Sequence, residues 1–86
     1  MATPNAVEVM EEIITEEPMR NFNHDLIQVL SEKLDGVVRY QVYHEDSEGE
    51  CDSCPRIWEQ IKEDDLRHIE MIRNEIINHV KRGTFD

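Results

Sequence analysis

The stretch that decides the fold is PRIWEQIKEDDLRHIEMIRNEIINHVK, residues 55–81. Its apolar side chains recur at steps of three and four residues, which predicts one helix of about 26 residues, about 39 Å long. Pro55 suits the first turn of a helix, and the cations Lys81 and Arg82 before Gly83 are typical of its end. The predicted inner stripe consists of Ile57, Ile61, Asp65, His68, Ile72 and Ile76.

A second long helix is predicted over residues 24–46, with Asn23 as its N-cap. Gly36 interrupts this helix, and we interpret it as a point of close packing between helices. Residues 37–43 have the composition of a β-strand, which is the competing prediction, but the helical spacing continues through them in phase. The predicted stripe comprises Ile27, Leu30, Leu34, Val37 and Val38, flanked by Leu26 and Tyr40.

We predict that residues 1–86 form a single all-α domain, which includes two further segments. Residues 4–16 predict a short N-terminal helix, and residues 46–54 have the composition of a turn. The two long helices would then form an antiparallel hairpin. Such a hairpin cannot cover both of its apolar stripes, so we expect a homo-oligomer, at least a dimer, in which two hairpins form a four-helix bundle.

The charge of the chain excludes several classes of partner. Nine Lys and Arg face twenty Asp and Glu among 86 residues, a net charge of −11. Such an acidic chain repels phosphate, so we expect no nucleic-acid partner and no binding to anionic membranes. Because no apolar run is longer than two residues, neither a membrane span nor a signal peptide is expected, and the predicted location is cytoplasmic.

Two polar residues interrupt the isoleucine stripe of residues 55–81. Asp65 and His68 are three positions apart and therefore project from the same face of a helix. One interpretation is a satisfied polar pair within the core, because buried polar groups usually have hydrogen-bond partners. The other is a metal site, since a carboxylate-x-x-His pair with a facing carboxylate is the di-metal arrangement of four-helix bundles.

The segments KLDGVVRY, residues 33–40, and EDDLRH, residues 63–68, resemble the ferritin-like superfamily. The similarity is to its short two-helix branch of encapsulated ferritins and rubrerythrin-like proteins, and it covers residues 24–80. It implies a ferritin-like four-helix bundle built from two subunits. It also implies an iron-binding protein with possible ferroxidase activity, an oxidoreductase function, at a di-iron site shared between subunits; manganese or zinc are alternative metals.

The resemblance carries over residue by residue. It implies that Asp65 and His68 are metal ligands and the catalytic residues, with Glu32 or Asp35 as the facing carboxylate. Lys33 departs from the family pattern, because it stands where the first helix of the family has its essential Glu, and an ammonium group cannot ligate a metal. The alternative is therefore a non-catalytic assembly or interaction module, in which a Lys33–Asp65 ion pair replaces the metal.

The cysteines and the remaining histidines leave their roles open. Cys51 and Cys54 form a single CxxC at the start of the predicted helix. They are compatible with a plain pair that shortens the turn, with a loop metal site that binds zinc or iron, or with a redox pair. His24 and His79 should lie near each other in an antiparallel hairpin, and we interpret both as surface residues.

Overall fold

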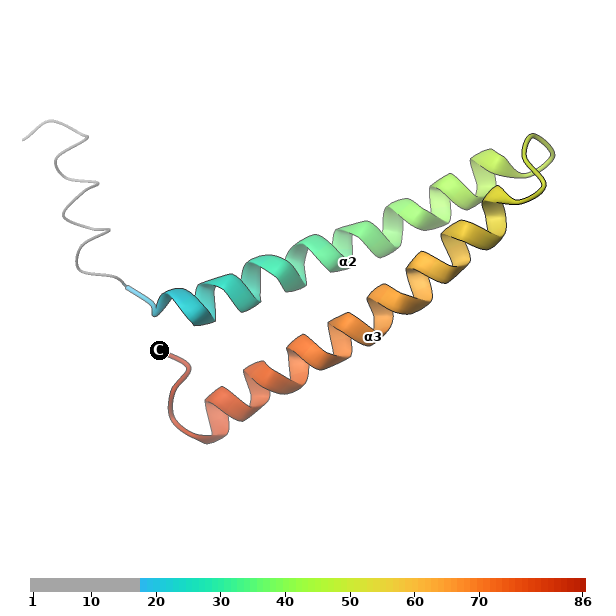
Figure 1. Cartoon of the computed structure of the whole chain (residues 1–86). Helices are drawn as coiled ribbons and strands as arrows, with labels where there is room; N and C mark the ends of the chain where they lie inside the picture. The colour runs from blue at the N-terminus through green and yellow to red at the C-terminus, as the bar shows by residue number, and fades with distance from the viewer. Residues whose placement is uncertain (1–17) are drawn as a thin grey trace, which may run out of the picture.

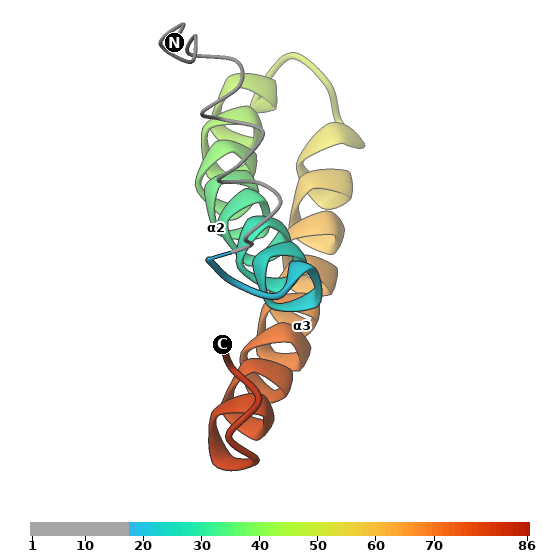
Figure 2. The ribbon, with the colours of Figure 1, turned by 90° about the vertical axis from the view of Figure 1, so that its left-hand side faces the viewer.

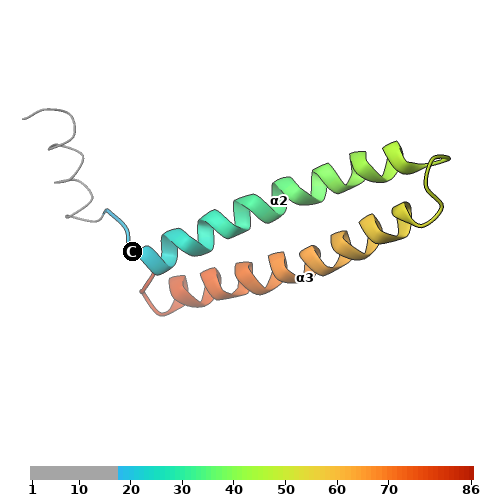
Figure 3. The same ribbon diagram turned by 45° about the horizontal axis from the view of Figure 1, so that its top comes forward.

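The computed structural model describes residues 18–86, and this part of the chain consists of two long helices with no strand. Helix α2 spans Asn21–Ser47 and helix α3 spans Cys54–Lys81. The helices run antiparallel, side by side, and are joined by one short loop (Figures 1 and 3). The helical interpretation of residues 37–43 is thereby confirmed, while the predicted helix over residues 4–16 lies outside the described residues.

The start of α2 differs from the sequence-based prediction. Arg20 is the N-cap, and Asn23, which was expected in that position, lies inside the first turn. Its side chain is fully buried and binds the C-terminal tail, with Nδ2 donating to the carbonyl oxygens of Thr84 (2.8 Å) and Asp86 (3.2 Å). Figure 2 shows this tail folding back toward the first turn of α2. The amide of Asn23 therefore closes the open end of the hairpin instead of capping its own helix.

The predicted stripes agree only in part with the faces that meet. In α3 the agreement is good, because the predicted Ile61, Asp65, Ile72 and Ile76 are all buried or half-buried, whereas α2 agrees at fewer positions. In α2 the inward positions follow a repeat of three and four residues through Leu26, Leu30, Lys33, Val37 and Tyr40. Ile27, Leu34 and Val38 of the predicted stripe are exposed. In α3, Ile69 is buried where His68 was expected, and Ile57 is exposed. Steps of three and of four both satisfy a helical pattern, so spacing alone did not fix the rotation of α2 or the inward residue that follows Asp65 in α3.

The apolar core of this hairpin is small. Among the described residues, Ile69 and Ile72 are the buried hydrophobic side chains, while the other buried side chains are polar. Large apolar side chains remain exposed on both helices, Phe22, Val29 and Met71 among them. Neither described helix contains a segment long and apolar enough to cross a membrane. The exposed apolar area is therefore spread over the faces of an amphipathic hairpin.

Candidate functional site

The centre of the hairpin contains a buried carboxylate shared by both helices. Asp65 of α3 has a side chain only 8% exposed, and its Oδ1 accepts a hydrogen bond from Lys33 Nζ of α2 at 2.8 Å. The Nδ1 of His68, one turn further along α3, lies 3.2 Å from the same oxygen. The ion pair between Lys33 and Asp65, which the sequence offered as the alternative to a metal, is thus present. Asp65 and His68 also share one face, as their spacing predicted.

The charges of this centre stabilise each other. The hydrogen bond from Lys33 holds the pKa of Asp65 below its ordinary value of 3.8, against the opposing effect of burial; hydrogen bonding from His68 and Tyr40 acts in the same direction as Lys33. The same bond raises the pKa of Lys33. Burial, and then interaction with Asp65, raise the pKa of Tyr40, so its hydroxyl stays protonated as a donor. At neutral pH the centre therefore holds one carboxylate, one ammonium and a neutral phenol.

Gly36 makes room for Tyr40. A methyl group on Gly36 would lie 3.3 Å from the Tyr40 hydroxyl oxygen and 3.5 Å from the adjoining ring carbon. The glycine is thus a point of close packing, but its neighbour is a side chain of its own helix one turn away, not the facing helix. The Tyr40 ring continues across to α3, where it stacks on Trp58 with centroids 6.1 Å apart. Gly36 thereby positions the tyrosine that flanks the ion pair.

The other predicted metal ligands do not join this centre. Glu32 is exposed and accepts a hydrogen bond from Gln28 on its own helix at 3.3 Å, and Asp35 is exposed as well. His68 is 47% exposed at the edge of the centre. Within residues 18–86, no group of three or more His, Cys, Asp or Glu side chains is placed to hold a metal ion. Because Asp65 is paired with the ammonium of Lys33 and no further carboxylate joins it and His68, the described residues of one hairpin do not fit a di-iron centre.

An open hollow of about 440 Å³ lies beside the polar centre. Lys33 and His68 stand at its edge, so the charged centre borders an otherwise mainly apolar surface. Met71, 64% exposed, is the most exposed of the large side chains there. The remaining lining residues are Phe22, Asp25, Leu26, Val29 and Ile72. We call the surface lined by these eight residues the central hollow.

The loop cysteines form a disulfide, Cys51–Cys54. The backbone N–H of Cys54, the first residue of α3, donates to Cys51 Sγ at 3.2 Å, so the sulfur satisfies a free amide at the start of the helix. This finding excludes, for the oxidised chain, a loop metal site built from both thiolates. A loop closed by so few residues constrains the unfolded chain by only about 2 kcal/mol. The disulfide is therefore a modest contribution to stability.

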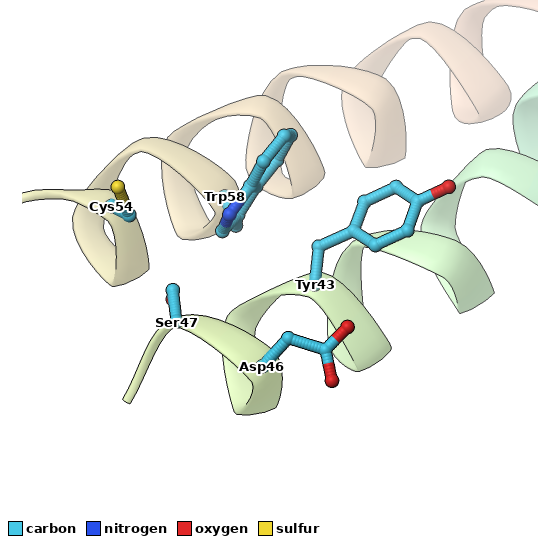
Figure 4. Close-up of a pocket in the computed structure, with 5 residues that line it drawn as sticks. All are labelled: Tyr43, Asp46, Ser47, Cys54 and Trp58. Atoms are coloured by element: carbon cyan, nitrogen blue, oxygen red, sulfur yellow. The ribbon is translucent and has the colours of Figure 1, made fainter. Parts of the chain in front are cut away.

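A second hollow, of about 430 Å³, adjoins this disulfide. In Figure 4, Cys54 and Trp58 of α3 stand opposite Tyr43 and Ser47 of α2, and Asp46 lies at the margin. The ring centroids of Tyr43 and Trp58 are 5.2 Å apart. The hollow therefore has aromatic walls, a carboxylate at its rim and a cysteine in its lining.

Sequence reasoning missed a polar cluster at the open end of the hairpin. His79 was predicted at the surface, but it is buried, with 7% of its surface exposed. Its Nδ1 lies 2.6 Å from Asn23 Oδ1 and its Nε2 lies 2.8 Å from Glu75. The hairpin register does bring residues 24 and 79 to the same end, which was the available signal. The burial depends on the returning tail, which no local pattern indicates.

Comparison of the chain with protein-family models, with curated proteins and with solved structures finds no match. The resemblance to the ferritin-like superfamily therefore rests on the motif residues alone. The geometry described above is the basis for the function proposed next.

Proposed function

We propose that this chain is a non-catalytic assembly module, in which two copies of the hairpin pack together as a four-helix bundle. The observation that carries the proposal is the balance of apolar surface. Two hydrophobic side chains are buried among the described residues, while twelve large hydrophobic side chains are exposed. Burial of apolar area is the dominant favourable term in folding, and a lone hairpin gains too little of it.

The central hollow is the face that we assign to the second copy. It includes the buried Ile72 of α3, and residues of both helices line it. Helices α2 and α3 have nearly equal lengths of 27 and 28 residues, so the helices of two such hairpins can pack along their whole length in a four-helix bundle. The acidic residues of two copies repel each other at long range, but physiological salt screens this repulsion within about 8 Å.

The polar centre would fix the register of this assembly. Lys33 and His68, which both contact Asp65, stand at the edge of the central hollow midway along the helices, so docking of the partner would remove them from water. A buried ion pair adds little net stability, yet it strongly disfavours arrangements that leave one of its charges unpaired. The pair thus acts as a specificity device within an otherwise apolar interface.

The sedimentation or light-scattering mass of the full chain tests the proposal. At micromolar concentration we expect a dimer or a larger homo-oligomer. Val29→Asp, which places a charge in the central hollow, should produce a smaller species. Val38→Asp is the matched control, because Val38 is on the same helix, is 67% exposed and does not line the hollow. A well-folded wild-type monomer, or equal effects of both variants, would contradict the proposal.

Melting experiments with and without added metal distinguish an assembly module from an iron-binding protein. Lys33→Glu replaces the ammonium beside Asp65 with the carboxylate that ferritin-like sites have at this position. In the assembly module this substitution places two carboxylates together and should lower the melting temperature with or without added metal. If Fe(II) or Mn(II) restores the melting temperature of Lys33→Glu and also raises that of the wild type, iron binding is favoured over the metal-free module.

A further inference from the structure

The loop that joins the two helices contains a cysteine pair that has no role in the proposed assembly. Cys51 and Cys54 form a disulfide at the start of α3, and the aromatic hollow of Tyr43 and Trp58 lies directly beside it. We propose that this loop is a thiol–disulfide exchange site, which oxidises a dithiol in a basic, cysteine-bearing polypeptide segment. The proposal does not depend on the oligomeric state.

The surroundings of Cys51 make it the leaving group. Its sulfur already accepts the N–H of Cys54 at 3.2 Å, and Ser53 Oγ lies 3.7 Å away as a further hydrogen-bond partner. A thiolate formed at this sulfur would keep these contacts and would face the positive end of the helix dipole of α3. Cys54 Sγ is covalently bound to Cys51 and has no hydrogen-bond partner among the described residues. Because Cys51 is thus the better leaving group, the incoming thiolate attacks at Cys54.

The exchange is balanced by the two thiols of the partner. One partner thiolate attacks Cys54 Sγ, the bond between the two cysteines breaks, and Cys51 leaves as a thiolate. The second partner thiolate then attacks the partner sulfur of the mixed disulfide, which closes the partner's own disulfide and releases Cys54. The partner loses two electrons, the cysteine pair gains them, and the two protons of the partner thiols pass to Cys51 and Cys54.

The charge of the loop selects the partner. Residues 45–53 contain no Lys or Arg, and five carboxylates lie within six positions of Cys51 in the sequence: Glu45, Asp46, Glu48, Glu50 and Asp52. All five are exposed. This field repels an acidic peptide thiolate and attracts a basic peptide, whose own cations also compensate its thiolate. The aromatic hollow adds a surface for an apolar or aromatic residue beside the partner cysteine.

The test follows oxidation of a synthetic dithiol peptide by the oxidised full chain. The probe peptide carries two cysteines, several lysines and one aromatic residue, and its isomer carries glutamates in place of the lysines. Samples are quenched by alkylation and read by mass spectrometry. We expect the lysine peptide to be oxidised at least about tenfold faster at low salt, with the preference reduced at high salt. Equal rates for the two peptides would overturn the proposal. So would a disulfide that is reduced by dithiothreitol and by neither of the two peptides.

Charge variants test the acidic loop separately from total charge. The loop variant Glu48→Gln/Glu50→Gln/Asp52→Asn should lose most of the preference for the lysine peptide. A helix variant with the same change in net charge should retain that preference: Asp35→Asn/Glu63→Gln/Glu70→Gln. If both variants behave alike, the selectivity comes from the whole chain, and the assignment of the loop as a partner site is overturned.

The position of the mixed disulfide tests the assignment of the two sulfurs. A lysine peptide with a single cysteine cannot complete the exchange, so the first intermediate can be trapped on the wild-type chain by alkylation. We expect fragment spectra to place this peptide on Cys54 and the alkyl group on Cys51. Trp58→Ala should slow the reaction with the aromatic peptide several-fold and leave reduction by dithiothreitol unchanged. A peptide located on Cys51 would overturn the assigned direction of attack.

Discussion

At the scale of single residues, Asp65 is the group on which the centre of the hairpin depends. Its carboxylate is almost completely buried, and the surrounding side chains supply donors from both helices. A buried carboxylate is costly unless it is paired, so these donors are required for Asp65 to remain ionised. The partner that matters most is Lys33, whose hydrogen bond has the largest effect on the pKa of Asp65.

Removal of Lys33 alone should therefore destabilise the fold more than removal of both Lys33 and Asp65. Lys33→Met leaves the Asp65 carboxylate without its cation and should lower the melting temperature clearly. The double variant Lys33→Met/Asp65→Leu removes both charges and fills the same space with apolar atoms, so its stability should return to the wild-type level or exceed it. Urea unfolding of the wild type, Lys33→Met, Asp65→Leu and the double variant measures the coupling. A neutral Lys33→Met would show that the pair is not coupled.

The lowered pKa of Asp65 also predicts the pH range in which the pair contributes. Because the folded pKa lies below the ordinary value of 3.8, this contribution is complete above pH 3.8 and is lost as the pH falls through the folded pKa. Asp65→Asn removes the titrating group and leaves the other carboxylates in place. The difference in melting temperature between wild type and Asp65→Asn should hence shrink as the pH falls below 3.8. A constant difference would contradict the assigned pKa shift.

At the scale of helices, α2 contains a local conflict between helix propensity and packing. Glycine within a helix costs about 1 kcal/mol relative to alanine, but a methyl group on Gly36 would lie 3.3 Å from the Tyr40 hydroxyl oxygen. Gly36→Ala should hence gain less than about 1 kcal/mol in the wild type and approach about 1 kcal/mol in a Tyr40→Phe background. Tyr43→Phe is the control background and should not change the effect. Urea denaturation gives the values, and equal gains in all backgrounds would contradict this packing.

The two helices also show which features of the fold could be predicted from the sequence. The existence of the two long helices and the turn between them followed from apolar spacing and from Pro55, which are local signals. The inward face of α3 followed at most positions, but the position after Asp65 did not, because His68 and Ile69 both fit the spacing there. Only contact with α2 decides between them, and that contact buries Ile69.

The candidate site shows the same division between local and tertiary signals. The pairing of Lys33 with Asp65 was predicted from the resemblance, because Lys33 stands where the family has the carboxylate that faces this site. The burial of Asn23 and His79 depends on the C-terminal tail, which returns across the open end and offers carbonyl oxygens to Asn23. Such long-range contacts have no periodic pattern. The disulfide was one of several open roles for the CxxC and was decided by the structure.

At the scale of the whole molecule, the question is whether the hairpin is stable by itself. Its described core consists mainly of polar side chains, and its large apolar residues lie at the surface. Short chains with so little buried apolar area generally need a further source of stability, such as a disulfide or association. The disulfide closes only a short loop, so the association proposed above would be the larger source.

If folding and association are coupled, stability must depend on protein concentration. For a dimer, a tenfold increase in concentration adds about 1.4 kcal/mol per complex, which should raise the melting temperature of this small chain by a few degrees. Val29→Asp, which places a charge in the central hollow, should lower the melting temperature and abolish its dependence on concentration, whereas Val38→Asp should keep that dependence. Circular dichroism melts over a hundredfold range of concentration measure this. If folding needs a second copy, mass action requires the melting temperature to rise with protein concentration. A wild-type melting temperature that is independent of concentration would therefore mean that the lone hairpin folds by itself.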